Sequence, residues 1–293
     1  MADEAIVIRG LEKTFSSFKL GPLDLNVPKG AIYGLIGPNG AGKTTTIDLI
    51  MGMGRKDAGT IEVFGLDHIE EEVAVKKQIG YVSPDLVFNA WSKVKRLLGF
   101  IRSFYDDWDD AYCVELMQRL KIGPSDTIST LSFGARTKLG LIVALSHRPA
   151  LLLLDEPLAG LDAVSKQEVF TELLDAVQDE NRTVLISSHD LHDLERFSDH
   201  IGMIHNGNLL LEGPTSDLVE RFRLVDCTVP DGQYLTRLQL PGIYRQKRDG
   251  ARARILVDIS NDRVQQLRSL GFTDIVTSPV TLEEILVGLV KDR

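Results

Sequence analysis

Residues 37–45 have the spacing of a loop that binds phosphate groups. Gly-Pro-Asn-Gly-Ala-Gly-Lys-Thr-Thr matches G-x-x-x-x-G-K-[ST], whose glycines leave backbone N–H groups free to point at one anion. Lys43 would reach the outer phosphates of a nucleoside triphosphate, and the Thr44 hydroxyl would hold a magnesium ion. The pattern therefore predicts a site for a nucleoside triphosphate with magnesium.

Two acids and a histidine follow apolar runs elsewhere in the chain. Asp155 and Glu156 come directly after four leucines, and His189 ends the run Val-Leu-Ile-Ser-Ser. Beside a phosphate loop, Asp155 can steer the shell of the magnesium ion, and Glu156 can accept a proton from an attacking water. The loop favours this interpretation of the two acids over a solvated strand end. His189, taken alone, fits either a phosphate contact or a structural histidine.

These side chains need a parallel sheet to bring them together. Residues 31–36, 151–154 and 184–189 are apolar enough to be buried strands, and residues 44–53 indicate a helix after the loop. Helical periods dominate residues 84–148, which predicts a helical subdomain inserted into an α/β core. An α+β region follows residue 213 and ends in an amphipathic helix over residues 281–291.

The composition favours an ordinary globular protein. The 293 residues are 43% hydrophobic and carry a formal net charge of -9, which disfavours binding to nucleic acid. Cys113 and Cys227 lack metal-like spacing and are expected to be reduced thiols. We expect neither a secretory signal at the acidic N-terminus nor a membrane span.

In their order along the chain, these motifs resemble the nucleotide-binding subunit of an ATP-binding cassette (ABC) transporter. The resemblance covers roughly residues 4–213. It matches the family's motifs in sequence: Phe15 at the adenine-stacking aromatic, residues 37–45 at Walker A, 131–135 at the signature, 151–156 at Walker B, 159–162 at the D-loop, and His189 at the switch histidine.

The resemblance implies a P-loop NTPase core with a mixed or parallel sheet, an antiparallel β subdomain, and the inserted helical subdomain. Residues 1–213 would form the ABC ATPase domain, with the helical subdomain at about 84–148, and residues 214–293 an accessory α+β region. The implied catalytic residues are Glu156, His189 and Lys43. The implied contacts with ATP are Phe15, Gly37, Asn39, Gly40, Ala41, Gly42, Lys43, Thr44, Thr45, Ser132, Gly134 and Asp162.

Two departures from the family pattern affect the predicted site. Phe133 and Ala135 occupy the third and fifth signature positions, which in the family are glycine and glutamine. Pro84 stands where the family has the Q-loop glutamine, and it has no side-chain group for magnesium or water. Asp85 is next to it and is the substitute we expect, so the expected magnesium site comprises Thr44, Asp155 and Asp85. Both departures bear more on turnover than on ATP binding.

The function that the resemblance implies is ATP hydrolysis that powers a separately encoded membrane permease, as in bacterial exporters of the ABC-2 type. Two such subunits, as a homodimer or a heterodimer, would pack head to tail with ATP between them. The protein would lie in the cytoplasm, at the inner face of the cell membrane, bound to its permease, with no nucleic acid as a partner. Two alternatives stay open: a soluble ABC-type ATPase acting on nucleic acid or ribosomes, and a regulatory cassette with weak hydrolysis.

Overall fold

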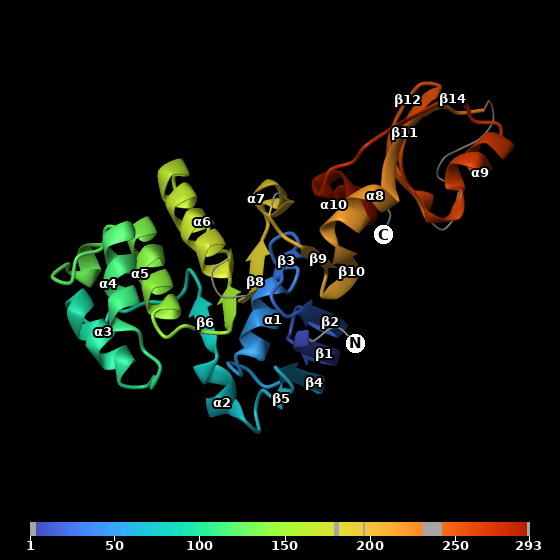
Figure 1. The fold of residues 1–293 in the computed structure, drawn as a ribbon. Coiled ribbons are helices and arrows are strands. Elements are labelled where there is room, and N and C mark those ends of the chain that lie inside the picture. Colours follow the sequence, from blue (N-terminus) through green and yellow to red (C-terminus); the bar gives the residue numbers. More distant parts are fainter. Residues whose placement is uncertain (1–3, 179–181, 196, 231–241, 292–293) are drawn as a thin grey trace.

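The computed structural model describes residues 4–178, 182–195, 197–230 and 242–291. These residues form three sheets with helices packed around them (Figure 1). Within these ranges, none of the helices combines the length and the hydropathy that spanning a bilayer requires. The architecture confirms the fold class predicted from the sequence.

The central sheet has six strands in the order β10-β9-β3-β8-β7-β6. All neighbouring pairs are parallel except β9 and β10, which form an antiparallel edge. The middle strands are buried on both faces, which explains their nearly continuous apolar sequences. The strands span Ile32–Ile36 (β3), Ile79–Val82 (β6), Leu151–Leu154 (β7), Thr183–Ser188 (β8), His200–His205 (β9) and Asn208–Pro214 (β10).

An antiparallel sheet formed mainly by the N-terminal residues packs beside the central sheet. Its order is β2-β1-β4-β5, with β1 at Glu4–Thr14, β2 at Lys19–Pro28, β4 at Ala58–Val63 and β5 at Leu66–Asp67. The apolar core between the two sheets also includes α1 (Lys43–Ile50), whose Ile47 is fully buried. A short helix, α2 (Glu72–Lys77), precedes β6. This core fixes the direction in which α1 leaves the phosphate loop.

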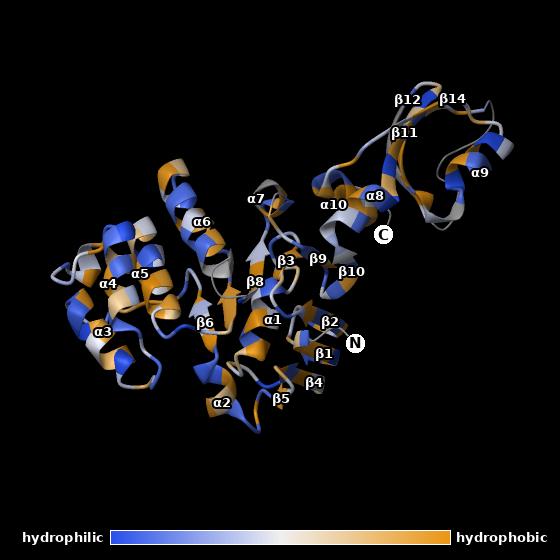
Figure 2. Cartoon of the chain, in the orientation of Figure 1, coloured by the Kyte–Doolittle hydropathy of each residue, from blue (hydrophilic) through white to orange (hydrophobic). Residues whose placement is uncertain are grey.

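Three helices form a separate group between β6 and β7. They are α3 (Val94–Arg102), α4 (Asp110–Arg119) and α5 (Phe133–Leu145), and Figure 2 shows hydrophobic and hydrophilic residues mixed along them. Asp109 begins α4 because its side chain accepts a hydrogen bond from the backbone N–H of Tyr112, at 2.9 Å. One carboxylate of the acidic cluster at residues 106–110 therefore caps this helix. A longer helix, α6 (Ala163–Gln178), follows β7 and packs on α5.

The C-terminal residues form a four-stranded antiparallel sheet with the order β12-β13-β11-β14. Its elements are α8 (Thr215–Arg221), β11 (Phe222–Thr228), β12 (Ile243–Asp249), β13 (Arg252–Asp258), α9 (Arg263–Ser269), β14 (Thr273–Ser278) and α10 (Leu282–Lys291). The last helix, α10, returns to pack on α7 (Leu191–Glu195). Leu282 and Ile285 lie in one apolar cluster with Leu191 and Leu194. The end of the chain is thus anchored next to the segment that follows His189.

Candidate active site

The phosphate loop, the two acids Asp155 and Glu156, and His189 follow strands β3, β7 and β8, which are neighbours in the central sheet. Because these strands are parallel, the loops after them leave from the same edge of the sheet. Ile36 pairs with Ser188, and Leu154 pairs with Ile186. This register brings the phosphate loop, the two acids and His189 to one edge.

The phosphate loop is held by close backbone packing. A Cβ atom added to Gly37 would overlap the carbonyl oxygen of Ile204 on β9 and lie 3.1 Å from the Cβ atom of Ala41. Gly42, the residue before α1, has a φ of 112°, which favours glycine. The first glycine therefore sets how closely the loop can approach β9, and Gly42 permits the turn into the helix.

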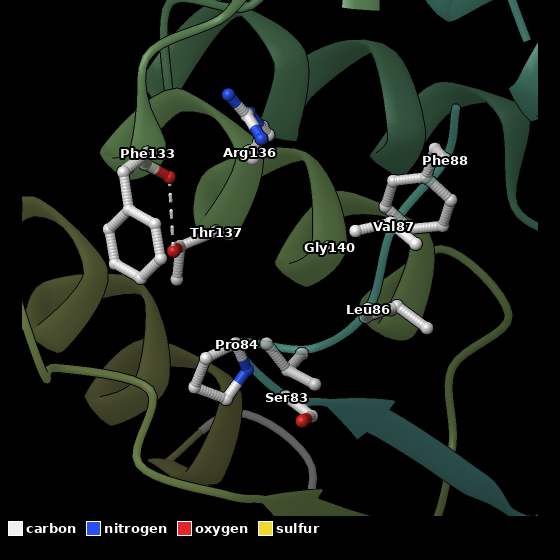
Figure 3. Close-up of a pocket in the computed structure, with 10 residues that line it drawn as sticks. Ser83, Pro84, Leu86, Val87, Phe88, Phe133, Arg136, Thr137 and Gly140 are labelled. Atoms are coloured by element: carbon white, nitrogen blue, oxygen red, sulfur yellow. Dashed lines mark hydrogen bonds between the residues drawn. The ribbon is translucent and has the colours of Figure 1, made fainter.

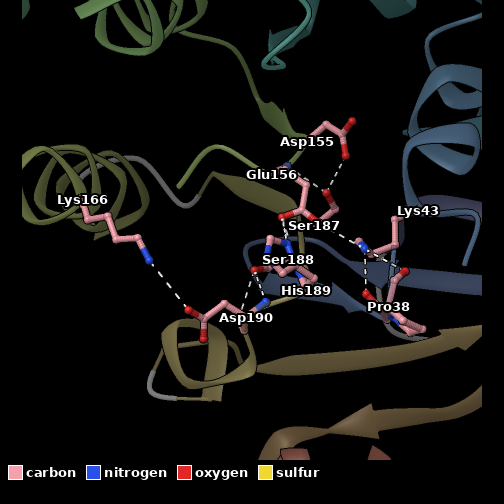
Figure 4. A network of polar contacts seen from close by, with 10 residues as sticks. Pro38, Lys43, Asp155, Glu156, Lys166, Ser187, Ser188, His189 and Asp190 are labelled. Carbon is pink, nitrogen blue, oxygen red and sulfur yellow. Dashed lines mark hydrogen bonds and ion pairs between the residues drawn. The ribbon is translucent and has the colours of Figure 1, made fainter. Parts of the chain in front are cut away.

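Lys43 links this loop to the acidic strand end (Figure 4). Its ammonium donates to the carbonyl oxygen of Gly37 at 2.7 Å and forms an ion pair with Glu156 Oε1 at 3.1 Å. The lysine is only 5% exposed, so its charge is partly removed from water and depends on these oxygen partners. A phosphate at the loop would compete for the same charge.

Glu156 also contacts the histidine predicted on the next strand. Its Oε2 lies 2.8 Å from His189 Nδ1, while Oε1 faces Lys43. Glu156 has a backbone φ of 46°, a left-handed conformation that costs a residue other than glycine on the order of 1–3 kcal/mol. Such strain persists only where surrounding contacts hold the residue. The structure thus brings together all three predicted catalytic residues.

A buried hydroxyl joins Asp155 to Glu156. Ser187 Oγ donates to Asp155 Oδ1 at 2.6 Å and accepts the backbone N–H of Glu156 at 2.9 Å. Asp155 is itself buried, and its own N–H donates to Val82 O on β6. Sequence reasoning missed Ser187. The available signal was a hydroxyl inside an otherwise apolar strand that ends at the histidine.

The residues predicted to hold magnesium lie in a region of negative charge. Burial raises the pKa of Asp48 on α1, and the charges of Asp155 and Asp85 raise it further. Thr44 is exposed at the start of the same helix. Within the described ranges, no group of three or more His, Cys, Asp or Glu side chains could cage a metal. This arrangement fits Mg²⁺, which usually binds one or two carboxylates together with substrate phosphates. Asp48 is not among the residues predicted from the sequence.

A hollow of ≈ 510 Å³ lies over the phosphate loop. The described residues that line it are Ser17, Phe18, Asn39, Gly40, Ala41, Gly42, Lys43, Thr44, Thr45, Glu156 and Asn206. The aromatic side chain among them is Phe18. Phe15, the predicted adenine contact, is 46% exposed just after β1, with its ring centroid 6.2 Å from that of Phe18. Phe18 and Asn206 are lining residues that the sequence did not indicate.

The signature and D-loop residues lie together where the start of α5 packs against the loop before α6 and against α6 itself. Ser132 begins α5, and its hydroxyl accepts the N–H of Ala135 at 3.2 Å. A Cβ atom on Gly134 would approach Ser165 Oγ to 3.1 Å, so this end of α5 packs closely on α6. Asp162 caps α6 by accepting the N–H of Ser165 at 2.9 Å, and these hydrogen bonds lower the pKa of Asp162. None of these described residues lines the hollow over the phosphate loop.

Pro84 and Phe133, one residue from each departure from the family pattern, border one small pocket of ≈ 30 Å³. It lies between residues 82–88 and α5, with Pro84 on one side and Phe133 on the other (Figure 3). The Phe133 ring also covers Gly160 of the D-loop, where an added Cβ atom would lie 3.3 Å from the ring. The Phe133 side chain thus occupies space that the glycine of the family pattern would leave open.

Comparisons with known proteins agree with this geometry. The family model described as "ABC transporter" matches residues 20–159. The "ABC transporter ATP-binding protein YtrB" of Bacillus subtilis is 35% identical over 218 residues, covering 74% of both chains. The "Bacitracin transport ATP-binding protein BcrA" of Bacillus licheniformis is 34% identical, covering 73% of this chain and 71% of that protein. A solved "ATP binding subunit of ABC transporter" superposes with a TM-score of 0.67 at 23% identity, covering 74% and 92%.

Proposed function

The chain belongs to the family of ABC transporter ATP-binding proteins, which are ATPases, and on that premise we propose that it powers a separately encoded membrane permease. The transport of bacitracin, named for one relative, supports an exporter of the ABC-2 type. Bound to its permease, the protein would lie in the cytoplasm at the inner face of the cell membrane.

The main support for the proposed hydrolytic role is that Glu156 contacts both Lys43 and His189. A γ-phosphate bound at the loop would take over the Lys43 ammonium, because it carries more negative charge than one carboxylate. Glu156 would then be released from the ion pair at 3.1 Å and become the base for an attacking water. ATP binding and activation of the base are thereby coupled through one lysine.

Within this proposal, Glu156 accepts the proton of the water and His189 orders that water against the γ-phosphate. Thr44, Asp155 and Asp85 would hold magnesium, which would offset the negative charge of the phosphates. Loop residues 37 and 39–45 would bind the phosphates, and Phe15 or its neighbour Phe18 would stack on the adenine. The hollow of ≈ 510 Å³ over the loop lies within the size range of pockets that hold small-molecule ligands.

We further propose that a second cassette, identical or related, completes the site. Ser132, Gly134 and Asp162 do not line the hollow over the loop, so within one chain they would not contact a ligand bound there. Head-to-tail pairing would bring the start of α5 of one cassette to the loop of the other. ATP between two cassettes would then hold them together until hydrolysis.

The pocket between residues 82–88 and α5 is the surface that we propose receives the permease. Val87 and Phe133 are both exposed and lie on opposite sides of the pocket, so its rim offers apolar contact to the partner (Figure 3). It lies at the end of β6, which runs beside β7 and its two acids. A conformational change at the two acids can therefore be transmitted through β7 and β6 to a permease bound at this pocket.

The test compares the parent chain with Glu156→Gln and with Glu72→Gln, a surface glutamate paired with Lys76. We expect the parent chain to bind ATP in a magnesium-dependent manner and to hydrolyse it. Glu156→Gln should lower kcat by about 10²–10⁴-fold while retaining ATP binding, because only the base is removed. Glu72→Gln should resemble the parent.

Hydrolysis by Glu156→Gln at the parental rate would refute the catalytic role, and a folded parent without affinity for magnesium and ATP would refute the whole proposal. The partner is tested by copurification with a candidate permease. Faster ATP turnover in that complex supports the motor role, and an unchanged rate contradicts it.

A further inference from the structure

Asp155 and Glu156 are adjacent in sequence, but their proposed roles require their carboxylates to point in different directions. One carboxylate has to face the magnesium shell and the other the attacking water. Glu156 achieves its direction through a left-handed backbone with a φ of 46°, immediately after the extended strand β7. A conformation of this kind needs support from another part of the chain.

Ser187 supplies that support from the neighbouring strand. Its side chain is fully buried, and its one hydroxyl contacts both residues. The direction of each hydrogen bond is fixed by chemistry, because an ionised carboxylate only accepts and a backbone N–H only donates. Ser187 therefore gives its proton to Asp155 Oδ1 and takes the N–H of Glu156 on a lone pair, at 2.6 and 2.9 Å.

The strand that carries Ser187 makes this contact significant for the reaction. Strand β8 lies between β3, which leads into the phosphate loop, and β7, which leads into the two acids. His189 follows Ser187 by two residues and contacts Glu156 Oε2. The side chain of Glu156 is thus oriented by His189 and Lys43, whereas its backbone is oriented by Ser187.

We propose that Ser187 is a positioning residue for ATP hydrolysis, setting Asp155 and Glu156 at the angle that the reaction needs. By occupying Oδ1 of Asp155, it leaves the second carboxylate oxygen to the magnesium shell. By holding the Glu156 peptide, it keeps the base pointed toward the phosphate loop. This inference rests on the proposed function, since it assumes the roles given there to the two acids.

Ser187→Ala is the informative change, because it removes the hydroxyl and leaves the strand in place. A shift of about 1 Å in a reacting group can cost on the order of 100-fold, so we expect kcat to fall roughly 10- to 100-fold. The KM for ATP should stay within about threefold, since the loop that grips the phosphates is unaltered. The magnesium concentration for half-maximal activity should rise, because Asp155 loses its orientation.

Two further variants separate positioning from a loss of structure. Ser187→Thr keeps the hydroxyl on a residue that strands favour, and it should restore most of kcat. Ser146→Ala removes another fully buried hydroxyl, one that donates to Ile142 O at the end of α5. It should lower thermal stability to a similar degree without changing kcat or the magnesium requirement.

The inference is overturned if Ser187→Ala hydrolyses ATP at the parental rate, or if its loss of activity matches that of Ser146→Ala. It is also overturned if Ser187→Thr is as impaired as Ser187→Ala although both remain folded. A parent chain that hydrolyses ATP, with a Glu156→Gln variant that does not, keeps the proposed function intact in each case.

Discussion

Replacing Gly37 by alanine tests whether packing against β9 sets the shape of the phosphate loop. The added Cβ atom would overlap the carbonyl oxygen of Ile204 and lie 3.0 Å from the Cγ2 atom of the same residue. The overlapped atom belongs to the backbone, so the strain is not relieved by a side-chain rotation. We expect the loop to shift by roughly 1 Å. A displacement of about that size can lower the rate of a reaction between oriented groups by about 100-fold.

The expected loss in ATP affinity follows from the contacts that a shifted loop cannot make. Hydrogen bonds to charged groups contribute about 1.5–3 kcal/mol each, so losing two costs about 3–6 kcal/mol. Gly37→Ala should therefore bind ATP at least 100-fold more weakly. The measurement is calorimetric or fluorescence titration of the full chain with ATP and magnesium, accompanied by thermal unfolding.

Gly65→Ala is the matched control, because this glycine lies in a turn with a φ of 80° and open space around its Cβ position. It should lose about 1–2 kcal/mol of stability from backbone strain alone and keep its ATP affinity. The reasoning is refuted if Gly37→Ala binds ATP within threefold of the parent, or if Gly65→Ala loses as much affinity.

Three further substitutions test contacts that stabilise other parts of the fold. Asp162→Ala should destabilise α6 by about 1 kcal/mol, measured by thermal unfolding, because its carboxylate caps the helix at the N–H of Ser165. Asp258→Asn should lower the free energy of unfolding at pH 7 by about 1–3 kcal/mol. Burial raises the pKa of Asp258, but hydrogen bonds from Arg221 and Ser260 outweigh it and leave the pKa lowered. The contribution of Asp258 to stability is therefore fully present above its pKa in the unfolded chain, and it is lost as the pH falls through its lower pKa in the folded protein. Denaturant titrations should show the unfolding free energies of parent and variant converging below about pH 4. Ile285→Ala in α10 should cost about 2–5 kcal/mol, and an unchanged melting temperature would contradict its complete burial.

The sequence predicted those parts of the site that depend on local pattern. Four leucines before two acids identified β7, because a run of that kind fits a strand buried on both faces. The order of strands ending in functional residues then sufficed to predict that Lys43, Glu156 and His189 meet.

Long-range contacts were beyond the same reasoning. A serine in an apolar strand has no local mark that distinguishes Ser187 from a tolerated polar residue, since its partners lie more than 30 positions away. The packing of Phe133 over Gly160 likewise depends on how α5 meets the loop before α6. The amphipathic pattern of residues 281–291 indicated that one face is covered, but it did not identify α7 as the cover.

The docking of α10 on α7 has a practical consequence for anyone who shortens this protein. Removing the residues after position 213 would strip the cover from Leu191 and Leu194, which share an apolar cluster with Leu282 and Ile285. These two leucines, which lie two and five positions after His189, would become solvent-exposed and would promote aggregation. The segment that positions the histidine would also lose part of its packing. A truncated protein would then show low ATPase activity because of altered packing and not because of its catalytic residues. Kinetic measurements should therefore use the full-length chain.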